Sequence, residues 1–449
     1  MIGRLLWRIT DGAERRWLIG LVAIAFALRL IAIAALPSPA ITVSESGRTA
    51  ANLVSGKGYT FDFYGYRTEN PLHSFMPPLY TLLLAGVMRA TPTHAGAALK
   101  LIQAVLSSLN VWLVYSIGIL SFDSATAIWA ALAMTLYPVN LVVVTQPTIT
   151  TVNIFLICLL IWALLRVRED SSWAWIAASG FVWGLNVLNR PLILAFGLGI
   201  ALWCFLGRRQ LHRNWLLLAG GITTAMLITV APWTLRNLSI HHALVPVSTN
   251  GGFTFWNGNN PFTTGSGFDV RRAQAEDYVG QAYAGQPYAG ENGSPIVVWE
   301  PYPLPREIAG RVADMDEIAL ERALYTAGLA FIREHPSDWL RLEGMKFVAL
   351  WWFRPHIGTY RDFYRPVWVR PYQVVYALLL VLLIGGLGIT RHRWRSLSLF
   401  YLLFAYVTAS FCAFNVITRY RWEFEPLIML FAAAAVARLI GIMTPPEAV

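Results

Sequence analysis

Apolar residues in this chain are concentrated in long blocks, which are separated by short breaks rich in Arg or in Pro and Gly. A helix needs about 20 apolar residues to cross the hydrocarbon core of a bilayer, whereas a membrane-spanning strand alternates over about ten residues. The pattern therefore predicts transmembrane helices. We place them at residues 17–36, 97–119, 124–140, 147–165, 172–188, 191–206, 215–235, 372–390, 396–416 and 424–441.

Basic residues fix the orientation of these predicted spans, because short loops that carry Arg and Lys stay on the cytoplasmic side of a membrane. We therefore place the N-terminal segment and three later loops in the cytoplasm, which leaves residues 37–93 and 237–371 on the outer face. The basic residues concerned are Arg4, Arg8, Arg15, Arg16, Arg166, Arg168, Arg208, Arg209, Arg213, Arg391, Arg393 and Arg395.

Two further apolar segments fit this orientation only as helices that lie on the outer membrane surface. Pro77–Ala90 is about fourteen residues long, which is too short to cross. Asp338–Phe353 is rich in Trp but carries Arg341, Glu343 and Lys346. The sequence thus predicts an all-α integral membrane protein, a helical bundle of about 10–12 spans with interfacial helices and two outer-face loops.

Composition supports the membrane interpretation. The chain is 56% hydrophobic and 13% charged, whereas soluble proteins carry about 25% charged residues. Much of the net charge of +10 lies in short loops, so we expect no nucleic-acid partner. Cys158, Cys204 and Cys412 all fall within apolar blocks and form neither a disulfide framework nor a metal-binding spacing. The first block lacks a small-residue cleavage site and is expected to be retained as a span.

Several basic residues are candidates for anion binding because they lie on the outer side, against the usual charge bias. Arg190, Arg236, Arg419 and Arg421 flank predicted spans there, and Lys346 lies in the second outer loop. Phosphate is a natural partner for Arg, which forms bidentate, charge-assisted hydrogen bonds with it. The alternatives are contact with lipid headgroups or, for the arginines, ion pairs with Glu423 and Glu425.

The outer loops also hold uncharged and acidic candidates. Glu45 follows the first span and could take a proton from an acceptor hydroxyl, or simply be a solvated charge at a helix start. His73 is a lone loop histidine, for which a structural role competes with a chemical one. The run Asn257-Gly-Asn-Asn-Pro261 predicts tight turns, with amides that face a sugar as the alternative.

Taken in order, several segments resemble bacterial GT-C glycosyltransferases of the protein O-mannosyltransferase and aminoarabinose-transferase type, over nearly the whole chain. Residues 45–59 resemble an acidic residue followed by an A-x-x-L-x-x-G-x-G-Y run, and Met76-Pro-Pro-Leu-Tyr80 resembles PP-x-Y. Two further segments carry the resemblance: residues 232–237 together with 258–261, and Arg419 to Pro426. Many members carry Asp where this chain has Thr42, whereas a subgroup places Glu at the position of Glu45.

The resemblance implies a GT-C fold and an inverting glycosyltransferase. The donor would be a sugar on a polyprenyl phosphate, and the acceptor a hydroxyl of a lipid, glycan or protein. Glu45 would be the catalytic base, while outer-face residues would bind the substrates in contact with membrane lipids. No ligand set for a metal or other cofactor is visible, although a divalent cation remains compatible. The expected substrate-binding residues are His73, Arg190, Arg236, Asn237, Asn259, Lys346, Arg419 and Arg421.

The expected organisation has three parts: a GT-C transmembrane module at 1–236 that includes the outer loop 37–93, a second outer loop at 237–371, and C-terminal transmembrane helices at 372–449. The resemblance places the protein in the bacterial cytoplasmic (inner) membrane, with its active site on the outer face. The competing hypothesis is a transporter, a flippase or a non-catalytic binder of lipid-linked sugars. The absence of a visible internal repeat weakens a transporter built from inverted halves.

Overall fold

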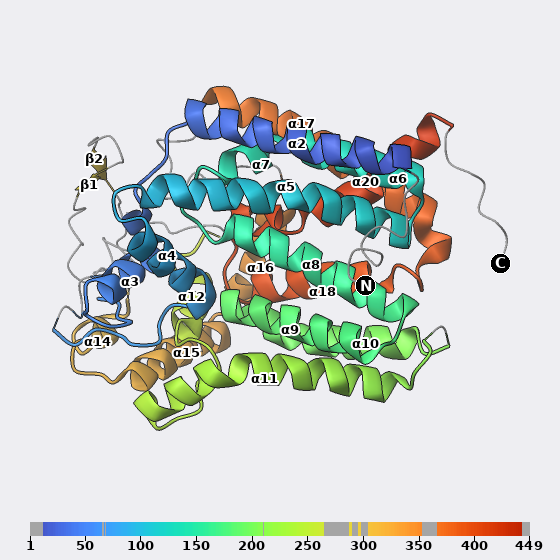
Figure 1. The fold of residues 1–449 in the computed structure, drawn as a ribbon. Helices are drawn as coiled ribbons and strands as arrows, with labels where there is room; N and C mark the ends of the chain where they lie inside the picture. The colour runs from blue at the N-terminus through green and yellow to red at the C-terminus, as the bar shows by residue number, and fades with distance from the viewer. Residues whose placement is uncertain are drawn as a thin grey trace.

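The computed structural model describes residues 12–64, 67, 69–209, 211–264, 287–289, 295–297, 304–352 and 366–441. Long helices lie side by side in a bundle, and shorter helices gather at one end of it (Figure 1). This arrangement follows from the sequence, since a helix satisfies its own backbone hydrogen bonds where no water is present. The all-helical bundle predicted from the apolar blocks is confirmed.

Within the described residues, five helices are long and apolar enough to cross a membrane. They correspond to five of the predicted spans. They are α2 (Gly12–Ala35), α5 (Ala95–Ser121), α8 (Thr150–Glu169), α11 (Trp215–His241) and the segment Arg370–Arg393, which contains most of α17 (Pro366–Thr390).

The other predicted spans are helical but shorter than 18 residues, so the total number of crossings stays a prediction. Proline divides the predicted span 124–140 and separates the spans 172–188 and 191–206, because the residue before a proline is pushed into an extended conformation. Pro138 and Pro191 each begin a new helix after such a residue. The shorter helices are α6 (Ser124–Leu136), α7 (Pro138–Val143), α9 (Trp173–Asn189), η2 (Pro191–Phe196), α10 (Gly197–Leu206), α18 (Ser398–Ala413) and α20 (Glu425–Leu439).

Close helix packing holds the bundle together. α9 packs on α11, and α20 packs on α17 and α6. Gly180 permits the first contact, because a Cβ atom added there would lie 2.3 Å from the carbonyl oxygen of Ile222. Small residues allow helix backbones to approach in the same way in membranes generally.

Arg29 is a buried charge of α2 that sequence reasoning did not single out. It is fully buried and donates to the Ser107 hydroxyl at 2.9 Å and to the carbonyl oxygens of Met134 and Thr135 at 3.1 Å. These carbonyls lie at the C-terminal end of α6, where a helix has no internal donors for them. Arg29 thus joins three helices.

We call the group of helices at one end of the bundle the cap: α3 (Glu45–Val54), α4 (Pro78–Ala90), α12 (Gly251–Gly258), α14 (Arg306–Ala309) and α15 (Glu317–Glu334) (Figure 1). Its core is aromatic, with Phe63 and Phe75 both packed against Phe253. The predicted interfacial segments form α4 and α16 (Pro336–Trp351). A two-stranded antiparallel pair, β1 (Pro287–Ala289) and β2 (Pro295–Val297), lies in the second loop of the sequence. The described residues also form three short helices: η1 (Ile41–Val43), η4 (Arg391–Arg393) and α19 (Thr418–Trp422).

Candidate active site

A cavity of about 780 Å³ lies between the cap and the ends of the bundle helices. Its walls come from α3, α4, α12 and α15 on the cap side, and from the α9–η2 junction, α18 and α19 on the bundle side. The charged residues that line it are Glu45, Arg190, Glu321 and Arg419. The cavity therefore combines acidic and basic groups, and it is large enough for a small organic ligand.

The start of α3 brings Glu45 to the cavity. Ser44 is the N-cap, and its hydroxyl accepts a hydrogen bond from the Gly47 N–H at 3.1 Å. Glu45 follows in the first turn and is half-buried. The Tyr64 hydroxyl donates to Glu45 Oε1 at 3.3 Å. A carboxylate held in this way at a cavity wall is a candidate proton acceptor.

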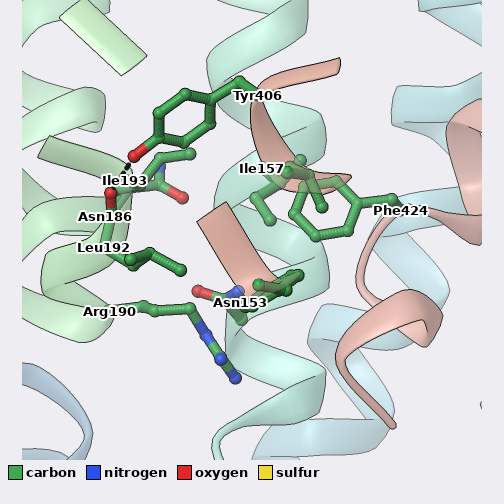
Figure 2. A pocket seen from close by; sticks show the side chains of 10 residues that line it. Asn153, Ile157, Asn186, Arg190, Leu192, Ile193, Tyr406 and Phe424 are labelled. Atoms are coloured by element: carbon green, nitrogen blue, oxygen red, sulfur yellow. Dashed lines mark hydrogen bonds between the residues drawn. The ribbon is translucent and has the colours of Figure 1, made fainter. Parts of the chain in front are cut away.

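Arg190 stands at the junction of α9 and η2, where Pro191 forces the chain out of the helix. Its guanidinium forms an ion pair with the fully buried carboxylate of Glu423 and lies 4.5 Å from the Tyr420 ring centre. Asn153 donates to the same carboxylate at 2.7 Å. Figure 2 shows Arg190 beside Asn153 at a small pocket next to the main cavity.

Two arginines line the bundle side of the cavity. Arg419 of α19 also lines the cavity, and its charge acts on Glu423 as that of Arg190 does. Two guanidinium groups thus face one carboxylate. The neighbouring carboxylate of Glu425 is matched by its own partner, Arg421, at 3.0 Å. Arg190 and Arg419 both present guanidinium groups at the cavity wall, which suit an anionic ligand.

Glu321 of α15 is the cavity residue that sequence reasoning missed. A Cβ atom on Gly252 would lie 2.2 Å from the Glu321 carbonyl oxygen, so only glycine allows α12 to approach so closely. Burial raises the pKa of Glu321 to about 7, with a contribution from Glu317, and the Gly252 N–H opposes the shift. Helical spacing of acids was visible in the sequence, but spacing alone does not say which one faces a cavity.

Both cavity carboxylates come from the cap. Tyr64, which donates to Glu45, packs against Phe253 with 5.4 Å between ring centres. Phe253 follows Gly252, whose N–H donates to Glu321. Glu45 and Glu321 therefore belong to the cap, whereas Arg190 and Arg419 belong to the bundle. The cavity has an acidic side and a basic side.

Three predicted binding residues lie elsewhere, in a polar joint between the cap and α11. Arg236 donates to the His73 carbonyl at 2.8 Å and to the Ser74 hydroxyl at 2.9 Å. Asn237 accepts from the same hydroxyl at 2.9 Å. Glu317 accepts from the backbone N–H groups of His73 and Ser74 at 2.6 and 2.9 Å. His73, Arg236 and Asn237 do not line the cavity, and these contacts join the cap to α11.

The remaining predicted residues also lie outside the cavity lining. Lys346 is fully buried and donates to Asn259 Oδ1 at 3.1 Å and to the Cys412 carbonyl at 2.7 Å. Arg421 is buried and donates to the carbonyl oxygens of Leu350 and Trp352 at 2.7 and 2.6 Å. These contacts tie α16 to α12, α18 and α19. Of the predicted set, the structure brings together Glu45, Arg190 and Arg419 at the cavity.

No group of three or more His, Cys, Asp or Glu side chains that could hold a metal ion occurs in the part of the chain that the structure describes. The carboxyl groups of the cavity wall support proton transfer, and its guanidinium groups support anion binding. Tyr325, one turn after Glu321, adds a phenol whose pKa burial raises to about 12.

Comparisons with known proteins agree with this architecture. The model of the dolichyl-phosphate-mannose-protein mannosyltransferase family matches residues 76–234. No curated protein sequence matches the chain.

Among solved structures, the oligosaccharyltransferase AglB from Archaeoglobus fulgidus, in complex with an inhibitory peptide and a dolichol-phosphate, is 13% identical with a TM-score of 0.55. That match covers 96% of this chain and 51% of that one. Its apo form is 12% identical with a TM-score of 0.53, over 98% and 54% of the two chains. ArnT from Cupriavidus metallidurans, bound to undecaprenyl phosphate, is 17% identical with a TM-score of 0.41, over 94% and 78%.

The chain spans about half the length of the oligosaccharyltransferase structures that it matches. At this level of identity, the two likenesses to the oligosaccharyltransferase show the fold: the protein is a helical membrane protein with the GT-C fold.

Proposed function

We propose that the protein is an inverting glycosyltransferase that moves a sugar from a polyprenyl phosphate to a hydroxyl group of an acceptor. The observation that carries the proposal is that Glu45 shares one cavity with Arg190 and Arg419. A base and a phosphate site must both reach the reacting sugar, and a common cavity allows this.

The matched proteins favour this class of donor. The matching family model is described by its use of dolichyl-phosphate-mannose, and one AglB structure holds a dolichol-phosphate. Both molecules join a long prenyl tail to a phosphate. A cavity at the ends of apolar helices with two arginines in its wall suits such a lipid, whose tail stays in the bilayer. We infer that it opens to the outer face of the bacterial cytoplasmic membrane.

In the proposed reaction, an acceptor hydroxyl attacks the anomeric carbon of the donor sugar while Glu45 takes the hydroxyl proton. The bond between that carbon and the phosphate oxygen breaks, and polyprenyl phosphate leaves with the electron pair. Its negative charge grows as the bond breaks, so Arg190 and Arg419 stabilise the transition state more than the ground state. In this proposal, Glu45 and the two arginines lie on opposite sides of the sugar, as in-line attack and inversion require.

Replacement of Glu45 by Gln tests the proposal, because Gln keeps the size of the side chain and loses its basicity. General-base catalysis contributes about 10²–10⁴-fold, so turnover should fall by that factor while donor binding survives. Sugar transfer from undecaprenyl-phosphate-linked glucose or mannose to an acceptor extract would be followed with detergent-purified protein.

Glu69→Gln and Asp62→Asn are the controls. Glu69 is exposed, and Asp62 faces Arg48 at 3.9 Å outside the cavity lining. Normal turnover in Glu45→Gln with loss in a control would move the catalytic role to that control residue. Normal turnover in all variants would favour a binder or transporter of lipid-linked sugars instead.

A further inference from the structure

Four polar side chains cover part of the cap side of the cavity, and we call them the polar patch. Glu321 and Tyr325 lie one turn apart on α15, Asn250 directly precedes α12, and Thr254 lies in its first turn. All four are half-buried and line the cavity. Carboxyl, phenol, amide and hydroxyl groups together offer both donors and acceptors of hydrogen bonds, as the hydroxyl groups of a sugar require.

The fold packs α12 closely against the polar patch. A Cβ atom on Gly251 would lie 2.4 Å from the Tyr325 hydroxyl oxygen and 3.1 Å from Glu321 Oε1, so the backbone of α12 reaches both side chains. The Tyr325 ring packs against Phe255 with 5.3 Å between ring centres. Side chains fixed before a ligand arrives lose little entropy on binding, which favours specific recognition.

The polar patch belongs to the cap side of the cavity, whereas the arginines belong to the bundle side. Arg190 and Arg419 lie on the bundle side, where the prenyl tail and phosphate of a lipid donor would enter. Glu45 and Glu321 belong to the opposite side and are connected through Tyr64 and Phe253. A sugar attached to the phosphate would extend from the arginines toward this acidic side. A second anion would be disfavoured there by the carboxylates.

We propose that Glu321, Tyr325, Asn250 and Thr254 form a subsite that hydrogen-bonds the hydroxyl groups of an uncharged sugar ring. The inference rests on the proposed function for the statement that the sugar belongs to a lipid-linked donor. The same chemistry would also suit the sugar of an acceptor. Binding to the patch itself does not depend on turnover, so it can be measured separately.

The experiment compares binding of bare undecaprenyl phosphate with binding of the glucose-, mannose- and N-acetylglucosamine-linked forms by detergent-solubilised protein. Wild-type protein should bind one or more of the sugar-linked forms about tenfold or more tightly than the bare lipid, since hydrogen bonds to a carboxylate are strong. Glu321→Gln and Tyr325→Phe should remove most of that gain and leave the affinity for the bare lipid unchanged. Glu334→Gln, an exposed residue at the end of α15, should behave as wild type.

A second arm measures binding of the soluble methyl glycosides of the same sugars, with and without bare undecaprenyl phosphate. A different outcome is that Glu321→Gln loses glycoside binding and still binds the sugar-linked lipids more tightly than bare undecaprenyl phosphate. That result would assign the patch to the sugar of an acceptor. The proposal is overturned if both variants keep wild-type sugar binding in both arms, or if wild-type protein gains nothing from any sugar. Failure of wild-type protein to bind bare undecaprenyl phosphate would overturn the proposed donor class, while the glycoside arm would still decide the subsite.

Discussion

Arg190 and Glu423 form an ion pair at the cavity, and the carboxylate of Glu423 is fully buried. Arg190→Ala would leave that carboxylate without the pair, and breaking a buried ion pair costs about 3–5 kcal/mol. We expect the lower end of this range, since Asn153 still donates to Glu423. The melting temperature in detergent should therefore fall.

The double variant Arg190→Ala/Glu423→Gln should recover most of the lost melting temperature, because the unpaired charge is gone. It should not recover binding of undecaprenyl phosphate, because the cation is still missing. Recovery of both properties would show that Arg190 serves folding alone.

Arg419 has a different expected effect. Arg419→Ala removes a cation from the cavity wall, and the loss of a charge-assisted contact costs about 1.5–3 kcal/mol, or roughly 10–150-fold in affinity. The dissociation constant for undecaprenyl phosphate should rise by that factor. Arg322→Ala, an exposed arginine of α15, provides the control for the loss of one positive charge. Equal affinities in the two variants would contradict a phosphate role for Arg419.

Glu321 makes stability depend on pH. Its pKa is raised from 4.5 to about 7, so the folded protein keeps a proton that the unfolded chain releases between these values. Stability must then fall as pH rises through this interval. The melting temperature of wild-type protein should drop between about pH 5 and pH 8, and Glu321→Gln should drop less. Parallel profiles for the two proteins would show that Glu321 does not bind the proton.

Among the helices, α9 packs on α11, and this contact helps to position Arg190, which directly follows α9. The contact depends on Gly180, where an added Cβ atom would collide with the α11 backbone at 2.3 Å. Gly180→Ala should destabilise the protein by about 1–3 kcal/mol, as overpacking does. The change would appear as a lower melting temperature and weaker lipid binding.

Gly220→Ala is the matched control for that prediction. Gly220 lies in α11 with no other atom within 4 Å of an added Cβ, and alanine is favoured over glycine in a helix by about 1 kcal/mol. This variant should keep or raise the melting temperature. A loss as large as that of Gly180→Ala would mean that helix propensity, and not packing, limits this region.

The orientation of the whole molecule in the membrane is open to a labelling test. Ser55 is exposed at the end of α3 in the cap, and Arg208 is exposed in a loop predicted to be cytoplasmic. Ser55→Cys should react with a membrane-impermeant thiol reagent in intact cells, because the cap is predicted to lie outside. Arg208→Cys should react only after permeabilisation. The three native cysteines are buried, so their background labelling should be low. The reverse pattern would invert the proposed orientation.

The sequence determined the helical membrane architecture. Long apolar blocks leave the backbone no water to bond to, so helices such as α5 and α8 form wherever such blocks occur. Its motifs also led to Glu45, whose place is local: a residue in the first turn of α3, just after Ser44. The number of crossings could not be determined in this way, because Pro138 splits one predicted span and the other remaining spans form helices shorter than 18 residues.

Tertiary contacts alone decided which charged residues share the cavity. Arg236 and Arg419 look equivalent in the sequence, since both flank apolar blocks on the predicted outer side. Arg236 nevertheless binds the His73 carbonyl and Ser74 across 163 and 162 positions of chain, whereas Arg419 reaches the cavity. Glu321 became a cavity residue because Gly251 and Gly252 let α12 pack against α15. A side chain's neighbours from distant segments depend on helix packing, which no local pattern encodes.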